Sequence, residues 1–177
     1  MSKKKIIVFQ HVEHEDLENI EVFFSSKKYE FKKIKFFKNQ KIPQDLEIFS
    51  MMIVLGGPMD TWMEEKYPWL IEEKKSIKKF VVDMEKPFLG ICLGSQLLGE
   101  VLGAKIIKSK DSEIGFYKVR SNKILNEDKV CNYLPNIFEV FQWHSYEVKK
   151  IHDKNFAILA SSKNTEVQLF RYKKHAY

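Results

Sequence analysis

Residues 87–99 constrain the fold more than any other part of the chain. They begin as a short apolar run typical of a strand and continue as an apolar pattern typical of a helix. Between the two stands Gly90-x-Cys92-x-Gly94, the arrangement of a nucleophile elbow with cysteine in the position of serine. Glycines on both sides leave room for a sharp strand-to-helix turn. The pattern therefore predicts that Cys92 lies at the end of a sheet in a strained backbone conformation.

The predicted turn has chemical consequences. Beside a helix N-terminus, the dipole and the free N–H groups would favour the thiolate form of Cys92. The backbone N–H of Leu93 would point to where the oxyanion of a tetrahedral intermediate forms. The alternative is a buried core cysteine, because free cysteine is among the most buried residue types. The flanking glycines and the change from strand to helix favour the nucleophile.

Length and composition limit the class of protein. The 177 residues suit a single domain, 1–177, and a hydrophobic content of 44% excludes wholesale disorder. No apolar run is long enough for a transmembrane helix. The net charge of +6 comes mostly from lysines spread among glutamates, with only Arg120 and Arg171 as arginines, which argues against a nucleic-acid partner. The two cysteines, Cys92 and Cys131, suggest no disulfide framework, so we expect a cytoplasmic protein without a membrane partner.

Strand and helix patterns alternate along the chain. Apolar or alternating runs predict strands over 5–9, 29–37, 50–55, 104–108, 114–119, 138–143, 157–160 and 167–172. Helical patterns occur over 16–26, 68–84 and 128–134, and a polar turn is expected at 110–113. The alternation predicts an α/β fold with a doubly wound, mostly parallel sheet and helices on both faces, of flavodoxin type.

Two further loops contain polar or flexible groups. Gly56-Gly57-Pro58 directly follows an apolar strand, so its backbone groups face whatever lies above the sheet, although an ordinary turn is an equal alternative. In such folds ligands bind beyond the carboxyl ends of the strands, where both glycine-rich loops lie. Residues 10–15 hold two histidines and three acids or amides, but their spacing matches no zinc motif. We therefore expect a loop and no metal or cofactor.

Three stretches together resemble the class I glutamine amidotransferases. Residues 56–60 resemble the oxyanion loop of that family, residues 90–96 its nucleophile elbow, and Trp143-His144-Ser145 the loop that holds glutamine. Residues 113–116 and 159–162 match the family in type and order. Residues 11–15 and 67–70 are similar to its stand-alone members of GMP-synthase-like type. The resemblance covers nearly the whole chain, and the elbow is its most specific motif.

The resemblance implies a chemistry. Cys92 attacks the side-chain amide of glutamine, ammonia leaves, and water hydrolyses the resulting thioester. The backbone N–H groups of Gly57 and Leu93 stabilise the oxyanion. The substrate would be held by Gly56, Pro58, Gln96, His144, Ser145 and Tyr146. For Gln96 the alternative is a helix surface residue, and for His144 a structural hydrogen bonder. A synthetase step would need another chain, because no ATP-binding motif is present.

The sequence departs from the family pattern at its C-terminal end. Family members complete the site with a His-x-Glu motif, whereas His175 is followed by Ala-Tyr and is expected to be an exposed terminal residue. Two explanations stay open: the domain is truncated at the C-terminus, or the protein lacks normal glutaminase turnover. The alternatives are a γ-glutamyl peptide hydrolase, which would use the same thiol, and a catalytically impaired binding or regulatory module.

Overall fold

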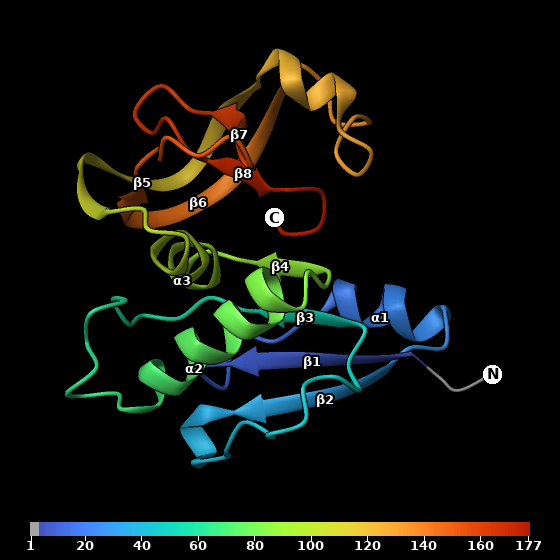
Figure 1. Cartoon of the computed structure of the whole chain (residues 1–177). Helices are drawn as coiled ribbons and strands as arrows, with labels where there is room; N and C mark the ends of the chain where they lie inside the picture. The colour runs from blue at the N-terminus through green and yellow to red at the C-terminus, as the bar shows by residue number, and fades with distance from the viewer. Residues whose placement is uncertain (1–3) are drawn as a thin grey trace.

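Two four-stranded sheets make up the computed structural model, which describes residues 4–177 (Figure 1). The first sheet is parallel, with the strand order β2-β1-β3-β4. Its strands are β1 Lys5–Gln10, β2 Glu30–Lys35, β3 Met51–Val54 and β4 Phe88–Gly90. The second sheet is antiparallel, with the order β6-β5-β7-β8. Its strands are β5 Ile106–Ser121, β6 Ile137–Val148, β7 Phe156–Ser161 and β8 Leu169–Tyr172.

The helices belong mainly to the N-terminal half of the chain. They are α1 Asn19–Ser26, α2 Trp69–Lys78 and α3 Leu93–Val101, with a π-helical extension of α2, η2 Lys79–Asp83. Short 3-10 turns occur at η1 Phe36–Lys38 and η3 Lys123–Glu127. Pro68 precedes α2, as predicted, and its fixed φ suits the first turn of a helix. None of the helices within residues 4–177 has the length and hydropathy needed to cross a membrane.

Strand β1 is buried on both faces. Because side chains alternate along a strand, Ile6 and Val8 pack with the α1 side of the sheet, in a cluster that includes Leu17 and Ile20. Ile7 and Phe9 face the opposite way, into the larger core that holds Leu70, Ile77, Phe80, Leu93 and Leu97. The parallel half therefore has helices on both faces, which confirms that part of the predicted fold.

The prediction of one mostly parallel sheet is wrong for the C-terminal half. Strands β5 and β6 pair antiparallel over most of their length, and no α-helix connects the strands after α3 within the described residues (Figure 1). A parallel pair needs a crossover connection of a dozen or more residues, usually a helix, whereas neighbouring antiparallel strands do not. The second half thus forms a separate antiparallel layer, with α3 between it and the parallel sheet (Figure 1).

Two local predictions in this half are also wrong. The expected turn at 110–113 is part of the continuous strand β5, where the pairing shifts register between Lys108 and Glu113. The expected helix at 128–134 is a turn, in which the carboxylate of Asp128 accepts hydrogen bonds from the backbone N–H groups of Val130 and Cys131. Such bonds are also those of a helix N-cap, but Pro135 follows within two turns and leaves no room for a helix to continue.

The C-terminal residues lie beside the strand that precedes the nucleophile. The N–H of Phe88 donates to the His175 carbonyl (2.8 Å), and the N–H of Gly90 donates to the Tyr177 carbonyl (2.8 Å). The expected exposure of His175 is wrong, because its ring is half-buried with Nε2 3.0 Å from the Val81 carbonyl. Residues 175–177 therefore continue the parallel sheet next to β4.

Candidate functional site

Cys92 occupies a strained turn between β4 and α3. Its backbone has φ 52° and ψ −108°, a region that residues other than glycine rarely adopt. A Cβ atom on Gly94 would lie 2.8 Å from the carbonyl carbon of Val54 and closer still to its oxygen. A Cβ atom on Gly90 would lie 2.7 Å from the backbone of Gly94. Only glycine fits at these two positions, which confirms the predicted elbow geometry.

The side chain of Cys92 is exposed and lines a pocket. Loss of hydration raises the pKa of this thiol, the charge of Glu15 raises it further, and the hydrogen bond from the Leu93 N–H lowers it. The pKa of Cys92 is raised on balance. The expectation that the helix N-terminus makes Cys92 a thiolate is therefore wrong for this structure, since desolvation and Glu15 outweigh the N–H donor.

Removing the charge of Glu15 is expected to activate the thiol. The Glu15 carboxylate lies against Gly56, which itself faces Cys92. Glu15→Gln should lower the pKa of Cys92, since an anion nearby disfavours the thiolate. The rate of alkylation of Cys92 by iodoacetamide is measured by mass spectrometry between pH 6 and 10. The midpoint of this pH profile should shift to lower pH, and the rate at pH 8 should be severalfold higher. Glu13→Gln on the same loop is the matched control, and an equal shift there would contradict the assignment.

A pocket of about 770 Å³ opens above Cys92. Its walls come from the loop after β1, the Gly57-Pro58 corner after β3, the start of α3, β6 and the segment before β8. Six of the residues expected in the site line it: Gly57, Pro58, Cys92, Gln96, His144 and Tyr146. The structure thus brings together residues that are up to about half of the chain apart in the sequence.

The other three expected site residues, Gly56, Leu93 and Ser145, do not line the pocket. Gly56 still lies beside the nucleophile, since a Cβ atom added to it would be 3.5 Å from the Cβ atom of Cys92. Leu93 is buried, and its N–H points at the thiol. Ser145 does not line the pocket; its hydroxyl accepts a hydrogen bond from Ser112 (2.9 Å).

The expected glutamine-holding loop at 143–145 is part of strand β6, so the prediction of a loop is wrong there. This segment pairs with β5 on both sides of the register shift, which keeps it extended. Gln96 on α3 reaches it, since its Nε2 donates to the Tyr146 carbonyl (3.2 Å). That bond fixes the position of β6 relative to the helix that starts at the nucleophile.

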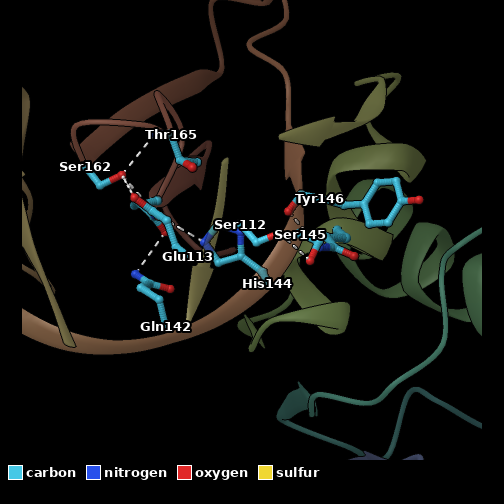
Figure 2. A network of polar contacts seen from close by, with 10 residues as sticks. Ser112, Glu113, Gln142, His144, Ser145, Tyr146, Ser162 and Thr165 are labelled. Atoms are coloured by element: carbon cyan, nitrogen blue, oxygen red, sulfur yellow. Dashed lines mark hydrogen bonds and ion pairs between the residues drawn. The ribbon is translucent and has the colours of Figure 1, made fainter. Parts of the chain in front are cut away.

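A buried polar network anchors His144. Figure 2 shows the carboxylate of Glu113 between Ser162 and His144, with Gln142 and Thr165 nearby. Ser162 Oγ donates to Glu113 Oε1 (2.6 Å), the amide of Gln168 donates to Oε2, and His144 Nε2 lies 3.2 Å from Oε2. Glu113 is fully buried. These contacts support the structural interpretation of His144, and its contact with substrate stays a prediction.

Several pocket residues were not predicted as site residues. They include His14, Glu15, Phe141, Gln142, Thr165, Val167 and Gln168. The similarity of residues 113–116 and 159–162 to the family pattern was a signal for the network, because Glu113 and Ser162 meet there. Gln168 lies in no motif, and it joins the pocket through the contacts of its side chain with Gln142 and His144 on β6.

Comparisons with known proteins agree with this geometry. The family model described as glutamine amidotransferase class-I matches residues 17–177. The chain is similar to the structure of a glutamine amidotransferase from Thermotoga maritima, with 36% identity and a TM-score of 0.86, covering 99% of this chain and 74% of that one. It is also similar to the structure of a GMP synthase subunit from Thermoplasma acidophilum, with 22% identity and a TM-score of 0.77, covering 100% and 82% of the two chains.

Curated relatives are longer than the matched region. A glutamine amidotransferase-like protein from Salmonella typhimurium is 27% identical over 143 residues, which are 80% of this chain and 59% of the relative. A glutamine-hydrolysing GMP synthase subunit from Thermoplasma acidophilum is 31% identical over 121 residues, which are 68% of this chain and 56% of the relative. The chain thus spans somewhat more than half the length of these relatives.

Proposed function

This chain belongs to the class I glutamine amidotransferase family, and we propose that it hydrolyses the side-chain amide of glutamine with Cys92 as the nucleophile. The observation that carries the proposal is the thiol on a strained turn, lining a pocket, beside the glycine corner of Gly56 and Gly57. A core cysteine would be enclosed by hydrocarbon, as Cys131 is by Leu125 and Leu159.

The proposed reaction has two steps. The Cys92 thiolate attacks the amide carbon of the glutamine side chain, so that an S–C bond forms and the carbonyl oxygen becomes an oxyanion. The N–H groups of Gly57 and Leu93 stabilise that oxyanion, and one such donor lowers the activation free energy by about 3 kcal/mol. The C–N bond then breaks, and the nitrogen takes up a proton and leaves as ammonia. Water hydrolyses the thioester to glutamate and free thiol.

The rest of the substrate would lie along α3 and β6. We propose that Gln96, Pro58 and the backbone at Ser145 and Tyr146 hold the amino and carboxylate ends of glutamine. Several relatives are named as glutamine-hydrolysing subunits of GMP synthase, and we propose that ammonia passes to a synthetase on a separate chain. We propose the cytoplasm as the location, because a thiol nucleophile needs a reducing compartment.

Proton transfer limits the expected rate. Within residues 4–177, no histidine forms a hydrogen bond with the Cys92 thiol. Loss of a triad base costs several orders of magnitude. We therefore expect this chain to release ammonia from glutamine at well under about 1 s⁻¹, the low end of ordinary turnover numbers. A coupled ammonia assay with asparagine as the control substrate measures this rate.

The assay separates three outcomes. Slow release from glutamine and none from asparagine supports the proposal, and fast turnover would contradict the expected rate. Glutamine binding by calorimetry with no hydrolysis and no acylation of Cys92 would favour a binding or regulatory module instead.

The pocket favours γ-glutamyl compounds as a second candidate substrate class. Its volume of about 770 Å³ is in the range that holds drug-sized ligands. Phe141, Trp143 and Tyr146 of β6 are among the residues that line it, and we propose that a substituent on the γ-nitrogen contacts these aromatic side chains. Much faster cleavage of a γ-glutamyl peptide than of glutamine, in the same assay, would decide for this class.

A further inference from the structure

His11 lies outside the predicted site, yet it contacts the glycine corner directly. It follows β1 and is buried, as is its partner Glu73 on α2. His11 Nδ1 lies 2.8 Å from the Gly56 carbonyl oxygen, and Nε2 lies 2.9 Å from Glu73 Oε1. The rings of Phe36 and Trp69 stack on the imidazole. The sequence pattern assigns this histidine to an ordinary loop, but both of its ring nitrogens have polar partners and its ring packs against an aromatic pair.

The donor and acceptor chemistry determines which nitrogen carries hydrogen. A carbonyl oxygen can only accept, so His11 Nδ1 donates its N–H to Gly56. The other ring nitrogen, Nε2, faces Glu73 Oε1, so the carboxyl group of Glu73 holds the ring in the orientation that directs Nδ1 at Gly56. Burial by itself lowers the pKa of His11, but the charge and hydrogen bond of Glu73, the Gly56 carbonyl and the charge of Glu15 raise it on balance. The ring is therefore a persistent donor to the corner.

This bond also fixes the next N–H group along the chain. The Gly56–Gly57 peptide unit is planar and trans, so the Gly56 carbonyl and the Gly57 N–H point in opposite directions. Because His11 holds the carbonyl, the Gly57 N–H points away from His11. Gly57 lines the pocket with Cys92, and its N–H has no hydrogen-bond acceptor within residues 4–177. It is thus available to a ligand in the pocket.

The corner needs such an external restraint. A peptide unit between two glycines has the least intrinsic preference for one orientation, since neither residue has a Cβ atom. A Cβ atom on Gly57 would lie 2.9 Å from the Cβ of His11, so the imidazole also packs directly against this glycine. One side chain therefore both supports the corner and fixes the orientation of its peptide plane.

We propose that His11, held by Glu73, is a positioning residue that aims the Gly57 N–H at the oxyanion formed when Cys92 is acylated. The proposal rests on the proposed function, because it assigns a role within that reaction. It gives the buried His11–Glu73 pair a function through the Gly57 N–H, and not through contact with substrate.

The test uses two amides that mimic different halves of the imidazole. In asparagine the amide nitrogen is as far from Cβ as Nδ1 is in histidine, so His11→Asn keeps a donor to Gly56. In glutamine the nitrogen corresponds to Nε2, so His11→Gln loses that donor while it fills more of the space. Both variants are made in Glu73→Gln protein, which avoids a buried unpaired carboxylate, and Glu73→Gln alone is the reference.

Two measurements separate the orientation of the Gly57 N–H from the reactivity of the Cys92 thiol. The probe is a γ-(4-nitrophenyl) ester of glutamate, from which nitrophenolate leaves with its electron pair as the Cys92 thioester forms, so no proton donor is required. We expect a single-turnover acylation constant reduced about 10- to 100-fold in His11→Gln, with the half-saturating ester concentration unchanged, because the oxyanion exists only in the transition state. His11→Asn should stay within about threefold of the reference. Alkylation by iodoacetamide should be alike in all three.

Each other outcome overturns a specific claim. If the reference protein is acylated at Cys92 and His11→Gln equals or exceeds His11→Asn, the role of His11 is only structural and the positioning proposal fails alone. If His11→Gln loses acylation and alkylation to the same extent, the substitution has displaced the thiol, and the positioning proposal also fails. If neither the ester nor glutamine acylates the unmodified chain at Cys92, the proposed function fails and the positioning role fails with it.

Discussion

Cys92→Ser is expected to abolish acylation by the γ-aryl ester of glutamate, with a rate constant lower by about 10³ or more. A serine hydroxyl is a weak nucleophile unless a base takes its proton, and no histidine is hydrogen-bonded at this position within residues 4–177. The thiol has a pKa raised from its usual value, yet it still ionises far more readily than an alcohol. The measurement is nitrophenolate release in single turnover, with mass spectrometry of the acylated peptide.

The second cysteine is the matched control. Cys131 is buried, and burial together with the charge of Asp128 raises its pKa to about 11. Cys131→Ala should therefore leave the acylation rate unchanged within about twofold. A Cys92→Ser protein that keeps more than about a tenth of the rate would show that another group attacks the ester, and the assigned nucleophile would then be wrong.

The N-terminal half was predictable because its strands are buried on both faces. Continuous apolar runs such as Met51–Val54 have few alternatives to a parallel strand between helices. The elbow was predictable for a related reason: Gly90 and Gly94 are the positions where a Cβ atom would overlap backbone. Packing constraints that act within a few residues leave a mark in the local sequence.

The C-terminal half was not predictable from local pattern, because its strands are half-exposed. Phe116, Phe141 and Trp143 are exposed on β5 and β6, so apolar side chains do not mark the core face there. The helical pattern at 128–134 is too short before Pro135 and forms only a turn. In this half, pairing between distant strands decides the structure.

The residues of the candidate site also differ in how far they could be predicted from the local sequence. Gly57, Cys92 and Gln96 lie in motifs and were predicted, whereas His11 and Glu15 depend on contacts across the sheet. The Cys92 pKa shows the limit most clearly, because the helix N-terminus is visible in the sequence but the desolvation and the Glu15 charge that outweigh it are not.

Gly94→Ala is expected to destabilise the protein by about 2 kcal/mol, although helix propensity alone predicts the opposite sign. Alanine in place of glycine within a helix gains about 1 kcal/mol. Here the added Cβ atom would lie 2.8 Å from the carbonyl carbon of Val54 and 2.9 Å from its Cβ atom, so α3 must move away from β3. Overpacking against backbone costs about 3 kcal/mol, which outweighs the propensity gain. Urea unfolding followed by circular dichroism measures the difference in the free energy of unfolding.

The same substitution at the other end of α3 provides the control. Gly103 has φ +89° and no atom within 4 Å of an added Cβ, so Gly103→Ala carries only the strain of a left-handed residue, about 1 kcal/mol. Movement of α3 in Gly94→Ala should also displace Cys92 and slow acylation, whereas Gly103→Ala should acylate normally. If Gly94→Ala were as stable as the unmodified chain, the close contact between α3 and β3 would not exist, and the strained turn that presents Cys92 to the pocket would lose its physical basis.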